Sequence, residues 1–244
     1  MADFDPTAYG ASGIADEYDE LYEGHWETDG AVDCLAGLAG GGRVLELGMG
    51  TGRLALPLVE RGVEVHGVDA SPEMVAELRK KPGGAGVPVA VGDFTTTRAG
   101  SGFAVVVLAA NTIFGLPDQQ AQVACFRNAA DHLAPSGRFV IEAWVPDVGA
   151  FRRNRAVRPR IIRPGIVSIE AAELDPVDQI MRTTQTVFSD GSVRLYPADH
   201  RYAWPAELDL MAQLAGLHRE ARWEDWRGSP FGAHSAAHVS VYRK

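Results

Sequence analysis

The segment from Arg43 to Arg53 constrains the fold most, because an apolar run ends in three glycines at alternate positions, Gly48, Gly50 and Gly52. A branched apolar run predicts a buried strand, and the glycines predict a tight loop that opens a helix. Such a loop lets a nucleotide-like ligand lie against bare backbone at the N-terminus of the helix.

The spacing of these glycines differs from the dinucleotide-binding fingerprint, which requires Gly-x-Gly-x-x-Gly. Here the third glycine comes one residue early, Arg53 follows it, and Glu46 lies two residues before the first glycine. This arrangement closely resembles the first motif of class I S-adenosylmethionine-dependent methyltransferases. Taken alone, the stretch is also compatible with a glycine-rich turn in an unrelated α/β domain or, less well, with a nicotinamide dehydrogenase.

Helix and strand patterns alternate over most of the chain, which predicts a doubly wound parallel sheet of α/β class. The expected helices cover 28–39, 54–60, 118–133 and 205–215, and one more begins after Ser71. The expected strands cover 43–47, 63–69, 87–91, 103–109, 138–144, 219–226 and 238–242. The resemblance implies a Rossmann-like, seven-stranded, mostly parallel sheet with an antiparallel final strand.

The pattern changes near residue 151, where β segments are expected at 160–173, 179–188 and 193–202. Asp190-Gly191 is a strong hairpin signal between the last two segments. We therefore expect one structural domain in three parts. Residues 1–150 hold an N-terminal lid segment and the cofactor-binding core, 151–204 an antiparallel β insertion that covers the substrate, and 205–244 the return to the core sheet.

Acidic or polar residues follow four of the expected strands: Glu46, Asp69, Asp93 with Phe94, and Asn111 after Ala110. Ligands of open parallel sheets bind at the carboxyl ends of the strands, and an acidic residue ending the second strand holds ribose hydroxyls. A carboxylate can accept hydrogen bonds from both hydroxyls of a vicinal diol. These strand ends therefore predict a single nucleotide site.

The resemblance implies that this site binds S-adenosylmethionine. Glu46 would act through ordered water or on the methionine amino group, and Gly48 and Gly50 would let the methionine part approach the backbone. The other implied contacts are Asp69 and Ala70 at the ribose, Met74, Asp93 and Phe94 at the adenine, and Ala110 and Asn111 at the amino group. Met74 is equally compatible with a plain core position.

The N-terminal segment resembles the Tyr-Asp-x-x-Tyr segment that precedes the core of many small-molecule methyltransferases. Tyr18 and Tyr22 are four residues apart and share one face of a helix. The resemblance implies a lid over the cofactor, and a helix that packs its tyrosines on the domain is the alternative.

Methyl transfer requires in-line approach to an activated methyl group, so positioning can supply roughly 7–11 kcal/mol of the barrier reduction. A general base is required only if the acceptor enters protonated. The candidate catalytic residues are Glu142, His200 and Tyr202, and His25, Trp26, Asn111 and Thr112 could line the acceptor site. Each has a structural role as its alternative.

The overall layout resembles bacterial secondary-metabolite methyltransferases, most of all those that methylate amino sugars and peptide N-termini. A small-molecule acceptor and N- or O-methylation are expected, with a non-catalytic S-adenosylmethionine-binding sensor as the alternative. The tetrad typical of nucleic-acid methyltransferases is missing, since Asn111-Thr112-Ile113-Phe114 stands in its place. No run of carboxylates indicates a metal site, so we expect none.

The net charge of −9 disfavours nucleic-acid binding. A basic run in 152–163 predicts either a solvated loop face or a site for an anionic substrate. Cys34 and Cys125 show no metal-ligand spacing and are expected to be buried helix residues. Without a secretory signal or a membrane-spanning run, we expect a cytoplasmic protein, monomeric or homodimeric, with no membrane partner.

Overall fold

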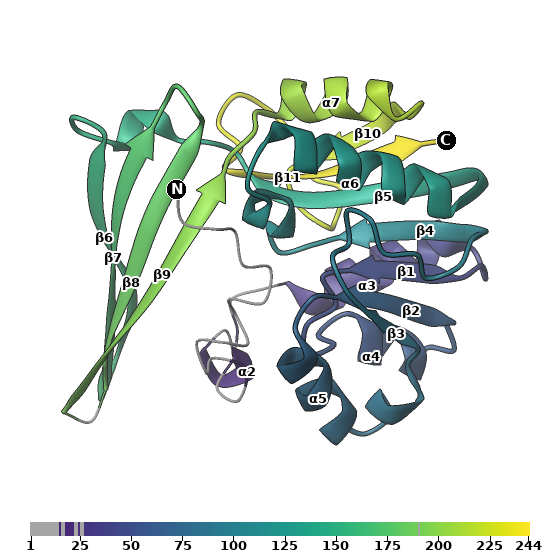
Figure 1. The fold of residues 1–244 in the computed structure, drawn as a ribbon, viewed down its shortest axis with the longest axis horizontal. Helices are drawn as coiled ribbons and strands as arrows, with labels where there is room; N and C mark the ends of the chain where they lie inside the picture. The colour runs from purple at the N-terminus through teal and green to yellow at the C-terminus, as the bar shows by residue number, and fades with distance from the viewer. Residues whose placement is uncertain (1–14, 16–17, 22–23, 25–26, 190) are drawn as a thin grey trace.

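The computed structural model describes residues 15, 18–21, 24, 27–189 and 191–244, and it contains two β-sheets (Figure 1). The larger sheet has seven strands in the order β10-β11-β5-β4-β1-β2-β3. The strands are β1 Val44–Leu47, β2 Val65–Asp69, β3 Val89–Val91, β4 Phe103–Leu108, β5 Leu133–Trp144, β10 His218–Trp223 and β11 Ala237–Arg243. β11 alone runs antiparallel to its neighbours. The predicted Rossmann-like α/β sheet is confirmed.

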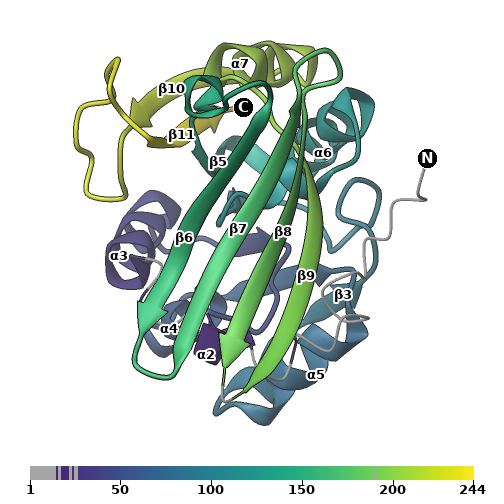
Figure 2. The ribbon, with the colours of Figure 1, turned by 90° about the vertical axis from the view of Figure 1, so that its left-hand side faces the viewer.

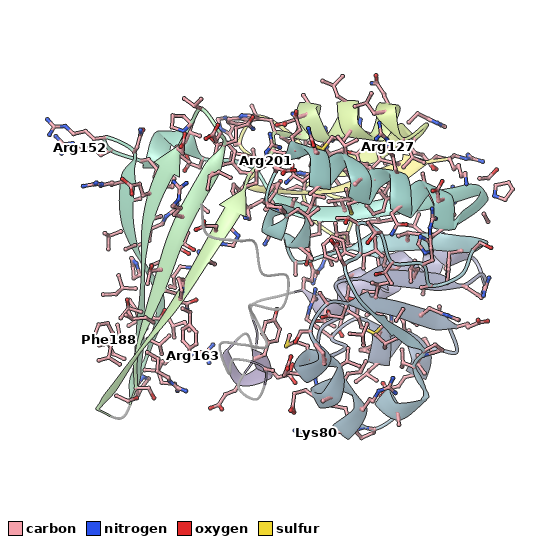
Figure 3. The ribbon with its side chains drawn as sticks, in the orientation of Figure 1. Lys80, Arg127, Arg152, Arg163, Phe188 and Arg201 are labelled. Carbon is pink, nitrogen blue, oxygen red and sulfur yellow. The ribbon has the colours of Figure 1, made fainter. Side chains whose placement is uncertain are left out.

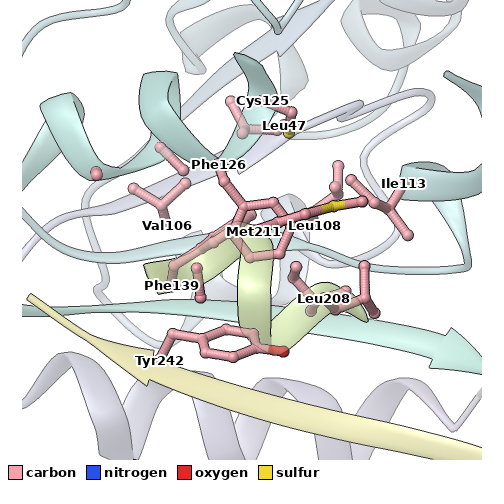
Figure 4. Close-up of a cluster of buried hydrophobic side chains, with 14 of the residues drawn as sticks. Leu47, Val106, Leu108, Ile113, Cys125, Phe126, Phe139, Leu208, Met211 and Tyr242 are labelled. Carbon is pink, nitrogen blue, oxygen red and sulfur yellow. The ribbon is translucent and has the colours of Figure 1, made fainter. Parts of the chain in front are cut away.

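Helices cover both faces of this sheet, which accounts for the apolar character of strands such as β4. On one face, α6 (Gln119–His132) and α7 (Pro205–Leu214) pack over a buried cluster that includes Phe126, Phe139 and Tyr242 (Figure 4). On the other face, α3 (Thr28–Ala39), α4 (Ala55–Glu60) and Leu78 of α5 (Pro72–Lys80) pack over a second cluster. Short 3₁₀ turns are η2 Gly84–Gly86, η3 Thr112–Gly115 and η4 Val148–Ala150.

Helix starts and ends follow the capping signals of the sequence. The Ser71 hydroxyl accepts the Met74 N–H at 3.2 Å, and the Asp118 carboxylate accepts the Ala121 N–H at 2.8 Å. Gly40 takes the left-handed conformation that ends α3. These contacts fix the helices that flank the carboxyl ends of the parallel strands.

The smaller sheet is antiparallel, with β6 Arg155–Arg163, β7 Ile166–Asp175, β8 Ile180–Ser189 and β9 Ser192–Arg201 in sequence order. The expectation of a single β segment over 160–173 is wrong, because β6 and β7 are two strands joined by a turn at Pro164 and Gly165, whose φ is +82°. From Arg155 to Arg163 the basic run is therefore an exposed edge strand with arginines spaced along it, and Arg152 and Arg153 lie in the turn before this strand.

The smaller sheet stands opposite the carboxyl ends of the parallel strands, and α2 (Tyr18–Leu21) lies between the two (Figures 1 and 2). Its inner face, toward the core, carries buried Ser168, Ala172, Thr183 and Val187. Phe188 projects from the outer face, which is solvent-exposed (Figure 3). No helix within the described ranges is long and apolar enough to cross a membrane.

Candidate functional site

The site lies where the chain reverses its direction of travel across the larger sheet. The central strand β1 pairs in parallel with β2 on one side and β4 on the other. The chain moves outward from β1 through β2 and β3, and then returns to β4. Ligands of open α/β sheets bind in the crevice at such a switch point, which here lies between the glycine loop and Ala110.

The glycine loop follows β1 with Gly48, Gly50 and Gly52 at φ values of +69°, +57° and +86°. The Gly48 N–H donates to the Val68 carbonyl oxygen at 2.8 Å, which ties the loop to the end of β2. A Cβ on Gly48 would lie 2.7 Å from Thr112 Cγ2. The glycine loop is therefore in direct contact with Thr112, just beyond the end of β4. Only glycine fits this conformation and this gap.

Asp69 ends β2 beside the glycine loop, and it is 8% exposed. Its Oδ2 accepts the Gly50 N–H at 2.6 Å, and its Oδ1 accepts the Ser71 N–H at 2.8 Å. Burial raises the pKa of Asp69, while these two backbone hydrogen bonds lower it. Each carboxylate oxygen retains a lone pair, so a buried diol is a suitable further partner.

Glu46 carries a buried carboxylate that its own chain leaves partly unsatisfied. Burial raises its pKa to about 8, with Arg53 lowering and Asp69 raising it. Its Oε2 has no hydrogen-bond partner among the described residues. A buried unpaired acceptor is costly, and a cationic or N–H-bearing ligand beside the glycine loop would satisfy it.

The remaining residues expected at the adenine lie near the same edge. The Asp93 carboxylate accepts the Thr95 N–H at 2.7 Å, and Asn128 of α6 donates to the Phe94 carbonyl oxygen at 2.8 Å. Met74 is buried at the start of α5, with its methyl group 3.3 Å from where a Cβ on Gly50 would stand. Phe94 is half-buried against the core cluster, and Ala70 directly follows Asp69.

At the end of β4 the chain adopts an unusual backbone. Ala110 and Asn111 both have positive φ, +53° and +62°. The Ala110 N–H donates to Glu142 Oε2 at 2.8 Å, and the Trp226 indole N–H donates to Glu142 Oε1 at 2.7 Å. Asn111 Oδ1 accepts the Trp144 N–H at 2.7 Å. Both Glu142 oxygens therefore accept hydrogen bonds from within the protein.

The N-terminal helix α2 is attached to the glycine loop through Asp19. The Thr51 hydroxyl donates to Asp19 Oδ1 at 2.6 Å, and Lys81 pairs with Asp19 Oδ2. The Lys81 ammonium also donates to the Thr51 carbonyl oxygen at 2.8 Å. Tyr18 lies on α2, and its contact with the cofactor stays a prediction. The predicted roles of Tyr22, His25 and Trp26 lie outside the described residues.

His200 and Tyr202 lie at and beyond the end of β9. His200 shares the inner face with Glu170, and burial lowers its pKa. Tyr202 is buried against Trp144 with ring centroids 6.4 Å apart, and burial raises its pKa. Within the described part of the chain no hydrogen bond joins the His200 or Tyr202 side chain to Glu142, so the three predicted catalytic residues form no hydrogen-bonded set there.

Three arginines of the basic run lie beside carboxylates of the neighbouring strand β7. Arg155 pairs with Glu173, and Arg158 and Arg160 flank Glu170 at 3.9 and 3.7 Å. Cys125 is buried on α6, whereas Cys34 on α3 is half-buried, because its helix faces solvent there. Within 27–189 and 191–244 no cluster of three metal-ligating side chains occurs.

Sequence reasoning missed three residues that shape the site: Asn128, Trp226 and Lys81. Each acts on a segment far away in the sequence, since Trp226 is 84 residues from Glu142 and Lys81 is 30 residues from Thr51. No local pattern indicates such pairings. A polar Asn on the buried face of α6 was the one available signal.

Comparison with known proteins agrees with this geometry. The methyltransferase domain family matches residues 44–137, from β1 to the start of β5. The chain is 31% identical over 210 residues to a cypemycin N-terminal methyltransferase of a Streptomyces species, covering 84% of each chain.

Solved structures extend the similarity to the whole chain. The CcbJ methyltransferase from Streptomyces caelestis superposes with a TM-score of 0.89 at 39% identity, covering 98% of this chain and 99% of that one. The amino pentose methyltransferase CalS10 from Micromonospora echinaspora, solved with S-adenosylmethionine bound, has a TM-score of 0.72 at 22% identity. The superposition with CalS10 covers 93% of this chain and 96% of that one.

Proposed function

The chain belongs to the S-adenosylmethionine-dependent methyltransferases, and from that premise we propose that it methylates an amine nitrogen of a small-molecule or short peptide acceptor. The enzyme class and the cofactor follow from family membership, which disfavours the non-catalytic sensor considered above. The amine and the roles of individual residues are our proposal.

The observation that carries the proposed residue roles is the fit of the switch point to the cofactor. Asp69 presents a buried carboxylate to a diol, and the glycine loop leaves room against bare backbone. Glu46 offers an unpartnered buried oxygen where a methionine ammonium would sit. We assign the ribose to Asp69, the methionine part to Gly48, Gly50 and Glu46, and the adenine to Met74, Asp93 and Phe94.

The bound sulfonium supplies an already activated methyl group, so the residues of this chain have to bind, orient and exclude water. The glycine loop and the end of β4 would fix the methionine part. The smaller sheet would hold the acceptor across from them, with α2 closing the space between. Displacement then needs a free lone pair on the acceptor nitrogen and alignment with the methyl group.

The inner face of the smaller sheet supplies the polar groups for such an acceptor. Glu170 and His200 lie on this face, and the lowered pKa of His200 keeps its imidazole neutral near pH 7. A neutral imidazole can accept the proton of an entering ammonium. We therefore retain His200 as the candidate base and assign Tyr202 to packing against Trp144. The cypemycin relative, named for an N-terminal amine, supports this acceptor class.

Substitution of Asp69 tests the cofactor assignment. Asp69→Asn is expected to weaken S-adenosylhomocysteine binding by about ten- to a hundredfold, because one oxygen that accepts hydrogen bonds is replaced by a donor. Calorimetric titration measures the affinity, and Asp131→Asn on the exposed end of α6 is the control. Unchanged affinity of the Asp69 variant would remove our ribose site.

A second measurement tests the acceptor class. We expect release of S-adenosylhomocysteine with primary or secondary amines, and little release with the matching alcohols. His200→Asn should shift the acid limb of the pH–rate profile and leave cofactor affinity unchanged. Turnover of alcohols in preference to amines would contradict the proposed acceptor.

We also propose a cytoplasmic enzyme that is monomeric or homodimeric and binds no nucleic acid. The net charge of −9 supports the last point, because nucleic-acid binding requires clustered basic surface. The two free cysteines support a reducing compartment. Sedimentation velocity measures the assembly state.

A further inference from the structure

The end of β4 holds two consecutive non-glycine residues in the left-handed region, Ala110 and Asn111. Side chains with a Cβ disfavour this conformation, and such strain persists only where surrounding contacts impose it. The strain lies beside the glycine loop, since Thr112 Cγ2 is 2.7 Å from the position that a Cβ on Gly48 would take. The contacts that impose it therefore act on the cofactor site.

Three hydrogen bonds join this turn to β5, and a fourth holds the Glu142 carboxylate. Glu142 Oε2 accepts the Ala110 N–H at 2.8 Å, and the Glu142 carbonyl oxygen accepts the Asn111 N–H at 3.1 Å. Asn111 Oδ1 accepts the Trp144 N–H at 2.7 Å. The second Glu142 oxygen accepts the Trp226 indole N–H at 2.7 Å, which fixes the carboxylate from the far side.

The consequence is a backbone acceptor that the described residues leave unpaired. With its N–H turned to Glu142, Ala110 keeps a carbonyl oxygen that no hydrogen bond reaches within the described part of the chain. A backbone carbonyl beside the glycine loop is a suitable acceptor for an ammonium group. The direction of the Ala110 carbonyl oxygen thus depends on the left-handed conformation of this turn.

We propose that Glu142 is a positioning residue, which together with Trp226 holds Ala110 in its left-handed conformation so that the Ala110 carbonyl binds the amino group of the cofactor. This inference rests on the proposed function, and it replaces the role of general base predicted for Glu142 from the sequence. Trp226 belongs to the connection between β10 and β11, so the carboxyl-terminal part of the chain supports the cofactor site.

Glu142→Gln tests the proposal, because the glutamine amide can accept one of the two N–H groups but turns a donor toward the other. We expect KM for S-adenosylmethionine and Kd for S-adenosylhomocysteine to rise about tenfold, with kcat changed less than threefold and the pH–rate profile unaltered. Loss of a general base would instead lower kcat by about 10²–10⁴ and remove the acid limb of the profile.

Rescue by glycine separates positioning from general damage to the fold. Ala110→Gly in the Glu142→Gln background should recover at least half of the lost affinity on a logarithmic scale, because glycine adopts positive φ freely. Trp226→Phe, which keeps an aromatic ring and removes the N–H, should raise Kd two- to fivefold. Adding Trp226→Phe to Glu142→Gln should raise Kd little further, since both substitutions disturb the same contact between Trp226 and Glu142.

Glu220→Gln is the matched control, because Glu220 lies on the edge strand β10, away from the cofactor site, and its carboxylate accepts two hydrogen bonds from Arg138 of β5. Its Kd should equal that of the wild type. The ¹⁵N chemical shift of the Trp226 indole reports on its hydrogen bond to Glu142 in the ligand-free protein. This chemical shift should change in the Glu142→Gln variant. Unchanged Kd and indole shift, or a lost acid limb, would overturn the proposal. A wild type that binds no S-adenosylhomocysteine would overturn the proposed function instead.

Discussion

Glu46 is a buried carboxyl group of the cofactor site with a raised pKa. Its pKa of about 8 lies well above the usual value of 4.5, because burial disfavours the carboxylate. The folded protein therefore holds a proton there that the unfolded chain releases. Between about pH 5 and pH 8 the ligand-free protein loses stability as the pH rises, and above pH 8 this contribution is constant.

Ligand binding should reverse this preference, because a cation favours the ionised carboxylate. We predict that S-adenosylhomocysteine binding at pH 7 releases close to one proton, and that affinity rises from pH 6 to pH 8. Titration calorimetry in phosphate and Tris measures the released proton. Glu46→Gln should abolish most of the release and weaken binding about tenfold at pH 8. Equal proton release in both proteins would show that another group titrates.

The sequence was sufficient to place single residues only where local pattern and sheet topology act together. Asp69 could be predicted because a strand pattern ends at it and the carboxyl ends of parallel strands converge. Glu142 could be placed at a strand end, but the contacts of its carboxylate could not be predicted, because Trp226, which donates to its second oxygen, lies 84 residues away.

Among the elements, α2 is the one whose attachment can be tested directly. This short helix is held to the glycine loop by Asp19, through the Thr51 hydroxyl and the Lys81 ammonium. Both partners are partly exposed, so the ion pair contributes about 0.2–1 kcal/mol. We predict that this contact limits how fast a bound cofactor is released.

Lys81→Met removes the ammonium and keeps most of the aliphatic stem. We predict that S-adenosylhomocysteine dissociates two- to fivefold faster, with the thermal midpoint unchanged within about one degree. Stopped-flow fluorescence measures the dissociation rate. Lys80→Met is the control, because Lys80 pairs with Glu77 within α5. Identical rates for the two variants would mean that α2 does not control cofactor release.

Most elements of the larger sheet were predictable because they carry a strong signal, such as the wholly apolar β4 or the Ser71 cap of α5. The expected start of β5 at residue 138 is wrong, because the strand begins at Leu133. The smaller sheet was predicted less well. In the edge strand β6, exposed arginines obscure the alternation of apolar and polar residues. The turn at Pro164 and Gly165 lies inside an otherwise continuous β pattern. A strand buried on both faces, such as β4, reads as a continuous apolar run, and the largely exposed β6 carries no such run.

At the scale of the whole molecule, the two sheets are joined by a buried polar network around Arg201, at the end of β9. Arg201 donates to Glu207 of α7 at 2.7 Å and to Gln122 of α6 at 2.6 Å. Gln122 donates back to the Arg201 carbonyl oxygen and to that of Ile113 in η3. The strand that carries His200 is thereby fixed to the turn beside the cofactor site.

Arg201→Met should therefore affect both stability and catalysis. Removing one partner of a buried ion pair costs about 3–5 kcal/mol, because the other charge is left without compensation. We predict a loss of about 3 kcal/mol in the free energy of unfolding, measured by urea denaturation. The KM for the acceptor should rise more than the KM for S-adenosylmethionine, since the smaller sheet loses its fixed position.

Two further variants separate the effects of charge and position. Arg182→Met removes an arginine from the same sheet whose pair with Asp199 is exposed and 4.0 Å long, so both stability and KM should change little. Adding Glu207→Leu to Arg201→Met should recover much of the stability, because no buried charge remains unpaired. It should not recover the acceptor KM, because an apolar contact does not fix the direction of β9 as hydrogen bonds do. Recovery of both would mean that the network stabilises the protein without positioning the sheet over the site.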